Sequence, residues 1–283
     1  MCARNGFGRL SSDSRIVRLS PQARSTSSSH QMSLQNKVAI VTGGSRGMGA
    51  GTAKELAFRG AKVLITYASN TAKADAVVAA IKAKGGEAAS VQADCMDEAS
   101  PKLVVDTCVR NFGQGIDIIV NNAGAGDEVY LKDTDMDHWN KLFHTNVRFP
   151  MFLVKESLPY LQKGGRIVNL SSVVARQAYT MQGAYGASKA CMESLARTWA
   201  LELGASHGIT VNCVNPGPVA TEMWAATPEE SIGDMAAFIK STPAEGRVGE
   251  VEDIVPIVAF LCDETSRWIT GSTVCANGGI CFT

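Results

Sequence analysis

The sequence predicts a single doubly wound α/β domain over residues 36–283, with a seven-stranded parallel sheet and helices on both of its faces. Two observations carry this prediction. Short apolar runs alternate with longer helical stretches throughout this part of the chain. Several of the runs are continuously apolar, as is typical of parallel strands that are buried on both faces. No linker that would separate a second domain interrupts the pattern.

The alternation places strands and helices in the order of a Rossmann-type sheet with right-handed crossovers. Each strand is an apolar run bounded by Gly, Asn or Ser, and the runs cover residues 37–42, 61–67, 87–93, 116–121, 165–171, 208–214 and 272–278. The helical stretches between them cover residues 47–59, 71–84, 97–112, 135–162, 184–206 and 250–262. Residues 217–247 break this rhythm. We expect a substrate lid at about 222–246, because open α/β sheets bind ligands outside the carboxyl ends of their strands.

Composition and charge exclude several classes of function. The 27 basic and 27 acidic residues give a formal net charge of zero, and the domain shows no basic stripe, so we expect no nucleic-acid partner. No apolar run approaches the roughly 18 residues of a membrane-spanning helix, so we expect no membrane partner. The eight Cys include no CxxC pair and the four His form no cluster, which favours buried thiols in a reducing compartment over a metal site.

Residues 1–35 are expected to form a disordered leader. Residues 1–31 carry five Arg against a single acid, a composition that fits a mitochondrial transit peptide, although Gly and Pro interrupt any long amphipathic helix. The alternative is that Met32 is the working start and the preceding residues are an extension of the gene model. We therefore expect a cytoplasmic protein, or a mitochondrial one if the leader is a genuine transit peptide.

A glycine-rich turn, "TGGSRGMG" (42–49), follows the first strand and opens the first helix. Glycine permits a tight turn and a close approach of the backbone to a pyrophosphate that rests on a helix N-terminus. Glycine also ends strands for structural reasons alone, but the position at the first strand–helix junction favours a dinucleotide site. The residues expected to bind the cofactor here are Gly43, Ser45, Arg46, Gly47, Met48 and Gly49.

The end of the second strand indicates which dinucleotide is bound. An NAD site usually places an acid here to bind the ribose 2′-hydroxyl, but the sequence "ITYASN" (65–70) has none. Arg46 lies in the glycine turn, where it can pair with a 2′-phosphate, and Ser69 and Asn70 supply further donors beside Tyr67. The sequence therefore predicts a preference for NADPH.

Tyr185 and Lys189 are four residues apart in a helical stretch, "AYGASKACMESLA" (184–196). A tyrosine has an ordinary pKa of about 10, and a cation on the same helical face favours the phenolate. The pair is thus suited to proton transfer, with Lys189 expected to lower the pKa of Tyr185. By itself the spacing also fits a half-buried aromatic side chain beside a solvated lysine.

Taken together, the motifs resemble the classical short-chain dehydrogenase/reductase family over the whole of residues 36–283. Within that family the sequence looks most like the NADPH-dependent ketoreductases, which include the β-ketoacyl carrier-protein reductases and the naphthol reductases of fungal polyketide pathways. The motifs that carry the resemblance are "TGGSRGMG", "NNAG" (121–124), Asn146, Ser172, "YGASK" (185–189) and "NPGPVAT" (215–221).

The resemblance implies a catalytic role for four residues. Tyr185 is the general acid, Lys189 holds the ribose hydroxyls and lowers the pKa of Tyr185, Ser172 binds the substrate oxygen, and Asn146 anchors a water that links Lys189 to solvent. It also implies that the "NNAG" segment packs beside the adenosine ribose, that Asp94 lies near the adenine and that Thr221 holds the nicotinamide carboxamide. The further cofactor residues implied are Asn121, Ala123, Gly124, Pro216, Gly217 and Val219.

One residue departs from the family pattern. Pro150 follows Asn146 by four residues, where the family usually has a small residue shortly after the Asn. Proline has no N–H to donate to the Asn146 carbonyl, which would be left free to accept from a water in the proton relay. The alternative is a packing kink without a functional role.

The function expected from these residues is reduction of a ketone to a secondary alcohol by hydride transfer from NADPH, in polyketide, secondary or fatty-acid-type metabolism. An NAD-linked secondary alcohol dehydrogenase on the same fold is the alternative, and a catalytically silent cofactor-binding scaffold is a candidate of a different class. The presence of all four catalytic residues argues against the scaffold. An enoyl reductase is expected to separate Tyr from Lys by more residues.

The substrate is expected to be a small carbonyl compound, flat or apolar in shape. The expected pocket walls, residues 125–138, 173–184 and 222–246, are rich in aromatic and Met side chains, namely Tyr130, Tyr179, Met181, Met223 and Trp224. These side chains would equally serve to fill core. The long helices at 135–162 and 184–206 have an apolar face. The resemblance implies that these helices pair across a two-fold axis, as in relatives that form tetramers, giving a homo-oligomer, either a tetramer or a dimer.

Overall fold

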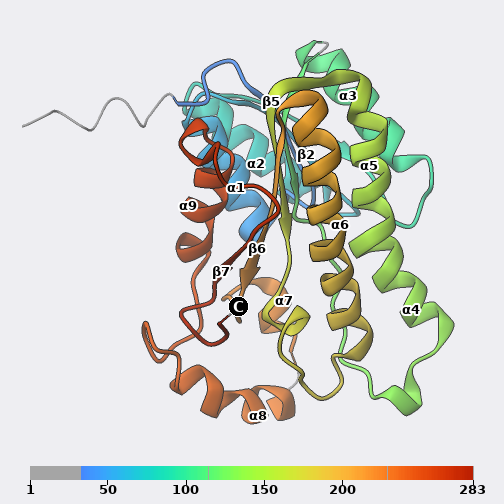
Figure 1. Cartoon of the computed structure of the whole chain (residues 1–283), viewed down its shortest axis with the longest axis vertical. Helices are drawn as coiled ribbons and strands as arrows, with labels where there is room; N and C mark the ends of the chain where they lie inside the picture. The colour runs from blue at the N-terminus through green and yellow to red at the C-terminus, as the bar shows by residue number, and fades with distance from the viewer. Residues whose placement is uncertain (1–32, 114, 228, 283) are drawn as a thin grey trace, which may run out of the picture.

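The computed structural model describes residues 33–113, 115–227 and 229–282, without the side chains of residues 229–234. Seven strands form one parallel sheet in the order β3-β2-β1-β4-β5-β6-β7, which confirms the expected fold class (Figure 1). Of the expected leader, residues 1–32 lie outside the described residues. The strands are β1 (Val38–Val41), β2 (Lys62–Tyr67), β3 (Glu87–Gln92), β4 (Ile116–Asn121), β5 (Leu161–Leu170), β6 (Thr210–Pro216) and β7 (Thr273–Ala276).

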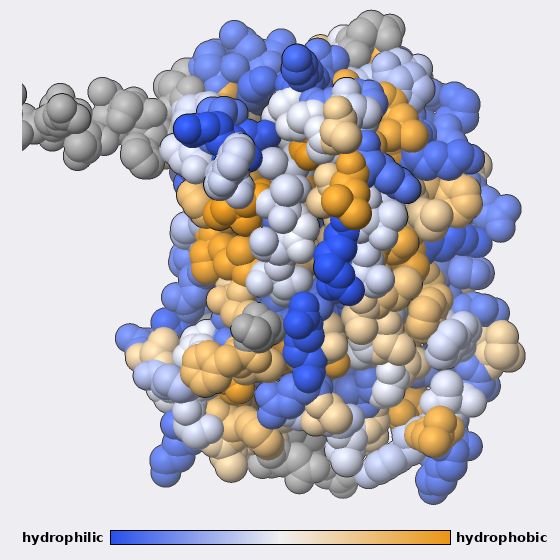
Figure 2. Space-filling model, in the orientation of Figure 1, coloured by the Kyte–Doolittle hydropathy of each residue, from blue (hydrophilic) through white to orange (hydrophobic). Residues whose placement is uncertain are grey.

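Helices cover both faces of the sheet. Helices α1, α2 and α9 pack on one face, and α3, α5 and α6 on the other (Figure 1). The α-helices of the described chain are α1 (Gly47–Phe58), α2 (Thr71–Ala83), α3 (Ser100–Phe112), α4 (Met136–Phe143), α5 (Phe149–Ser157), α6 (Gly183–His207), α7 (Glu222–Ala225), α8 (Glu229–Lys240) and α9 (Val251–Leu261). In this part of the chain no helix is both long and apolar enough to cross a membrane. Polar and apolar residues are interspersed over the face shown in Figure 2.

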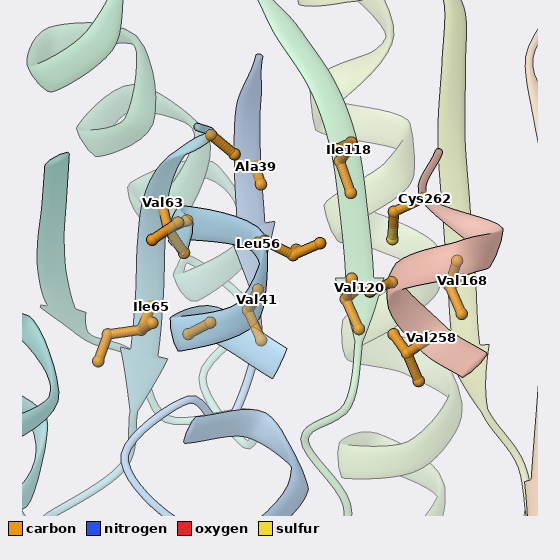
Figure 3. Packing of buried hydrophobic residues seen from close by; sticks show 14 of the residues in the cluster. Ala39, Val41, Leu56, Val63, Ile65, Ile118, Val120, Val168, Val258 and Cys262 are labelled. Carbon is orange, nitrogen blue, oxygen red and sulfur yellow. The ribbon is translucent and has the colours of Figure 1, made fainter. Parts of the chain in front are cut away.

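The continuous apolar runs of β1, β4 and β6 arise because these strands are buried along their whole length, with helices on both sides. In β1, Ala39 and Val41 pack toward α1 and α9, whereas Ile40, between them, packs toward α3 and α5. Figure 3 shows the first of these clusters, in which Leu56 of α1 and Val258 of α9 meet the strand residues. Full burial of each such side chain contributes about 1.5–3 kcal/mol to folding.

The strand order places a crevice at the centre of the sheet. The chain runs from β1 outward through β2 to β3, and then returns to add β4 on the other side of β1. Ligands of open α/β sheets bind at such a reversal, outside the carboxyl ends of the strands. The glycine turn after β1 and the "NNAG" segment after β4 both lie at this point.

The prediction of one continuous helix over residues 135–162 is wrong. It consists of α4, a π-helical turn (His144–Arg148), α5 and a short 3₁₀ turn (Leu158–Tyr160), and β5 already begins at Leu161. Pro150 gives the physical reason for the break, because its ring clashes with the preceding turn and it lacks an N–H. In the π turn the Phe149 N–H bonds to the His144 carbonyl, five residues back.

The segment expected to be a lid, 222–246, carries α7 and α8. Both lie at the carboxyl end of the sheet, at the bottom of Figure 1. The segment is therefore placed where a cover over the crevice would have to be.

Candidate active site

The glycine turn is packed directly against the segment that follows β4. Gly43 has φ of +63°, and a Cβ there would lie 2.9 Å from the Cα of Ala123. A Cβ on Gly49 would lie 2.2 Å from the carbonyl oxygen of Gly43, so neither position accepts a side chain. The Thr42 Oγ1 accepts hydrogen bonds from the N–H groups of Asn122 and Ala123, at 3.0 and 2.9 Å. The two halves of the expected dinucleotide site therefore form one rigid unit.

The expected adenosine-side residues lie at the carboxyl ends of β2 and β3. Ser69 and Asn70 are exposed, and the Asn70 Oδ1 accepts a hydrogen bond of 2.9 Å from the N–H of Lys73, which caps α2. Tyr67 is partly buried at the end of β2. Asp94 is exposed, and its Oδ1 accepts from the Met96 N–H at 2.9 Å.

Asn121 was expected to bind the cofactor, but its side chain lies inside the sheet. It is 4% exposed, and its Nδ2 donates to the Oδ1 of Asn169 on the neighbouring strand at 2.8 Å. The side chain therefore links β4 to β5, because the alternation along a strand directs it away from the crevice. Gly124, three residues later, lies at the site itself: a Cβ there would lie 3.4 Å from the Lys189 Nζ and 3.5 Å from the Asn146 Oδ1.

Tyr185 and Lys189 lie in the first two turns of α6 and face the end of β5. The Lys189 Nζ donates a hydrogen bond of 2.8 Å to the Leu170 carbonyl and lies 5.7 Å from the centroid of the Tyr185 ring. Ser172, just after β5, is hydrogen-bonded to the Tyr185 side chain. A Cβ on Gly126 would lie 3.4 Å from the Tyr185 ring, so the "NNAG" loop also touches the phenol.

Asn146 is buried in the π turn, and its side chain is fully engaged. The Oδ1 accepts from the Ala125 N–H at 2.8 Å, and the Nδ2 donates to the Ala125 carbonyl at 2.9 Å and to the Ser188 Oγ at 3.0 Å. The Ser188 Oγ donates to the Tyr185 carbonyl at 2.7 Å. Asn146 thus ties the loop after β4 to the first turn of α6.

Burial dominates the protonation of the two central groups. Desolvation raises the pKa of Tyr185, and the hydrogen bond with Ser172 offsets part of that increase. Desolvation lowers the pKa of Lys189 to about 8. The expected lowering of the Tyr185 pKa by Lys189 is therefore wrong for the chain alone. Burial disfavours both charged forms, and the Lys189 ammonium is directed to the Leu170 carbonyl.

A cavity of about 650 Å³ opens next to Tyr185. Four of the five expected wall residues line it, whereas Tyr130 is 53% exposed and lies outside the lining. Tyr179 packs edge-on against Phe238 of α8, with 5.7 Å between ring centroids. The cavity is also lined by Met48, Ser172, Pro216, Gly217, Val219, Thr221 and Ile239.

The sequence reasoning missed an ion-pair cluster at the edge of the crevice. The Glu222 carboxylate pairs with the Arg46 Nη1 at 3.0 Å and with the Lys73 Nζ at 2.5 Å. Lys73 follows the second strand by only six residues, which was the available signal for a second cation near a 2′-phosphate. Nothing local to Glu222 reveals its partners, which are at least 149 residues away in the chain.

A second missed group lies next to Ser172. Glu193 of α6 is 3% exposed, accepts from the Ser171 Oγ at 2.8 Å and pairs with Arg176. The Asn215 Nδ2 donates to the Ser172 carbonyl at 2.8 Å. These contacts hold the backbone on either side of the Ser172 side chain.

Among the described residues, no three or more His, Cys, Asp or Glu side chains lie together as a metal site would require. Three cysteines in this part of the chain, Cys108, Cys213 and Cys262, are buried free thiols. Burial raises the pKa of each of these three thiols to about 12, so they stay protonated.

Comparison with known proteins gives matches along nearly the whole domain. A family profile described as enoyl-(acyl carrier protein) reductase matches residues 43–281. The short-chain dehydrogenase/reductase FrzI of Cladobotryum sp is 49% identical over 251 residues, covering 88% of this chain and 97% of that protein. A probable tetrahydroxynaphthalene reductase of Zymoseptoria tritici is 35% identical over 258 residues, covering 88% and 96%.

The solved structures agree. A short-chain dehydrogenase from Burkholderia cenocepacia, solved in complex with NADP, is 39% identical, with a TM-score of 0.81 and coverage of 87% of this chain and 98% of that one. Sequence, sheet order and the arrangement around Tyr185 thus lead to one conclusion: the chain belongs to the short-chain dehydrogenase/reductase family and is an oxidoreductase that acts on CH–OH and C=O groups.

Proposed function

We propose that the chain reduces a ketone to a secondary alcohol, with NADPH as hydride donor and Tyr185 as proton donor. One observation carries the proposal. Tyr185 and Ser172 line a cavity that reaches Met48 of the glycine turn, Lys189 lies beside the Tyr185 ring, and Asn146 is linked to the same stretch of α6 through Ser188. Such a constellation of donors beside an open pocket is what carbonyl reduction requires.

The protein's part in the reaction is to orient the carbonyl and to supply a proton. Ser172 and the Tyr185 hydroxyl both reach the cavity, and together they can donate hydrogen bonds to one carbonyl oxygen. The raised pKa of Tyr185 keeps the phenol protonated before the reaction. As the oxygen gains negative charge, the Tyr185 proton moves to it, and the nearby Lys189 ammonium stabilises the phenolate that remains.

The described residues fit NADPH. The crowded glycines bring the backbone close to a pyrophosphate, and Arg46 and Lys73 place two cations at the ends of β1 and β2, where the acid typical of an NAD site is missing. Thr221 and the segment Pro216–Val219 line the inner wall, where the nicotinamide would be held. When bound, this cofactor supplies the hydride. The NADP complex of the Burkholderia relative supports the same assignment.

The cavity favours an apolar, flat substrate. Tyr179, Phe238, Trp224 and Met223 line it, and its volume of about 650 Å³ is within the usual range for a small-molecule site. The name of the Zymoseptoria relative points to a polycyclic aromatic ketone. We therefore propose a polyketide-derived aromatic ketone as the substrate class.

A panel of aromatic ketones, quinones, β-ketoacyl thioesters and enoyl thioesters, with NADPH oxidation as readout, tests the proposal. We expect turnover with aromatic ketones, and we expect Tyr185→Phe to lower kcat by about 10²- to 10⁴-fold while the Kd for NADPH stays unchanged. Ser206→Ala, on the exposed end of α6, is the matched control and should keep full activity.

The alternatives give different outcomes in the same experiment. An enoyl reductase, the activity in the description of the matching profile, would turn over the enoyl thioester alone. An NAD-linked secondary alcohol dehydrogenase would prefer NAD and the alcohol. If the protein bound NADPH but turned over no substrate of any class in the panel, the result would favour a catalytically silent, cofactor-binding scaffold.

A further inference from the structure

We infer that Arg46 and Lys73 together form the binding site for the 2′-phosphate of NADPH and that Glu222 of the lid competes with this phosphate for them, so that Glu222 sets how strongly the enzyme prefers NADPH over NADH. The inference rests on the proposed use of NADPH, and it assigns roles to Lys73 and Glu222 that the family motifs do not contain. It follows from the geometry and the charges of three side chains.

The three side chains come from three different elements. Arg46 directly precedes α1, Lys73 lies in the first turn of α2, and Glu222 is the first residue of α7. Each oxygen of the Glu222 carboxylate meets one cation: Oε2 meets Arg46 at 3.0 Å and Oε1 meets Lys73 at 2.5 Å. A carboxylate bridging two cations in this way occupies the position that a larger oxyanion would need.

The surroundings make this position the natural place for the phosphate. Both cations flank the carboxyl end of β2, where Ser69 and Asn70 are exposed and no acid is present within β2 or the turn to α2. The Oδ1 of Asn70 accepts from the Lys73 N–H, so its Nδ2 is the group of this side chain that can donate to a phosphate. Glu222 is therefore the acid that approaches the two cations, and it comes from the lid.

The charges decide the sign of the effect. The cluster holds two positive charges and one negative charge, and the two cations, Lys73 first, lower the pKa of Glu222, so its carboxylate is ionised at neutral pH. A 2′-phosphate that carries close to two negative charges must either displace this carboxylate or lie beside it, and both cost free energy. NADH, with a neutral 2′-hydroxyl, leaves the ion pairs in place. Glu222 therefore weakens NADPH binding and leaves NADH binding nearly unchanged.

The same contact links cofactor choice to the lid. Thr221, just before Glu222, has its side-chain methyl 3.3 Å from the position of a Cβ on Gly47, so the start of α7 already lies on the glycine turn. The Arg46 and Lys73 pairs fasten this end of the lid across the crevice. A bound 2′-phosphate would take the place of Glu222 in these ion pairs, whereas bound NADH would leave the ion pairs intact.

The test compares the Kd values of NADPH and NADH by fluorescence titration in Glu222→Gln, Lys73→Met and Arg46→Ala. Because both ion pairs of Glu222 are exposed and screened by solvent, their loss should have a modest effect, and we expect Glu222→Gln to bind NADPH about three- to tenfold more tightly. The Kd for NADH should change less than about twofold. Lys73→Met should weaken the binding of NADPH and leave the binding of NADH unchanged. Glu245→Gln, which removes a lid carboxylate that pairs with Arg247, is the matched control and should change neither Kd.

If Glu222→Gln binds NADPH with unchanged or weaker affinity while Arg46→Ala loses NADPH affinity, the competition by Glu222 is refuted and the proposed NADPH site stands. If Arg46→Ala and Lys73→Met both leave the ratio of the two Kd values unchanged, the placement of the 2′-phosphate is itself wrong. Thermal unfolding of each variant, at an unchanged midpoint, shows that it is folded.

Discussion

At the scale of single residues, the buried Lys189 connects catalysis with stability. Its ammonium is 5% exposed, and desolvation lowers its pKa from 10.5 to about 8. Between these two pH values the folded chain binds fewer protons at this position than the unfolded chain, so the free energy of unfolding should rise with pH across that window. The rise should amount to about 2–3 kcal/mol.

Urea denaturation at several pH values from about 8 to 10, on the wild type and on Lys189→Met, measures this contribution. The buried cysteines, whose raised pKa values act in the opposite direction, are present in both proteins. The difference between the two proteins therefore reports on Lys189 and on its interaction with Cys213. We expect the wild type to gain stability relative to Lys189→Met as the pH increases. Parallel pH dependences would contradict a lowered pKa for Lys189.

The sequence predicts which side chains gather at the site better than it predicts their ion pairs and pKa values. Ser172 is hydrogen-bonded to Tyr185 and Lys189 lies beside its ring, because a short motif on one helix and the end of one strand place these three residues. The bridge from Glu222 to Arg46 and Lys73 depends on how α7 is placed next to the starts of α1 and α2, which no local sequence pattern encodes. Whether the pKa of Tyr185 is raised or lowered depends on burial, which the spacing of residues in the sequence does not reveal.

At the scale of elements, the strands were predictable because burial on both faces requires continuous apolar runs. The early part of β5 was missed because Gln162 and Lys163 are exposed and give no apolar signal. The helix at 135–162 was expected as one element because its apolar spacing continues through Pro150. The widened π turn that precedes this proline buries Asn146, so the break also places a functional side chain.

The π turn gives a prediction for Pro150. Replacing it with alanine restores an N–H that can bond to the preceding turn and removes the clash of the ring, which favours a regular α-helix over the π turn. A regular helix would shift Asn146 relative to Ala125 and Ser188. We expect Pro150→Ala to lower kcat about three- to tenfold, on the order of one lost hydrogen bond, with little change in the Kd for NADPH.

Steady-state kinetics and NADPH titration on the same preparation separate these two effects. Pro256→Ala provides the matched control, because this proline lies inside α9, away from the catalytic residues. Its kcat should stay at the wild-type value. Equal losses in kcat and cofactor affinity for Pro150→Ala, or no loss at all, would show that the kink is only a matter of packing.

At the scale of the whole molecule, apolar side chains remain exposed on the helices beside the catalytic helix α6. Met151 and Phe152 of α5 are 44% and 40% exposed, and Trp139 of α4 is 40% exposed, with its ring stacked on Phe143 at 4.0 Å. Helices α4, α5 and α6 lie along one side of the molecule (Figure 1). We propose that this side pairs with a second copy of the chain across a two-fold axis, since an isologous contact covers the same apolar residues on both copies.

Sedimentation equilibrium tests the pairing with the double variant Met151→Glu/Phe152→Glu. Four buried carboxylates would face one another across the two-fold axis, so the Kd for self-association should rise by at least about 100-fold. Phe58→Glu, which places the same charge at a 51% exposed apolar position on α1, is the control and should leave the mass unchanged. A wild type that sediments as a monomer would refute the interface. An unchanged mass for the double variant would place the contact elsewhere, because two carboxylates per chain cannot be desolvated there without partners.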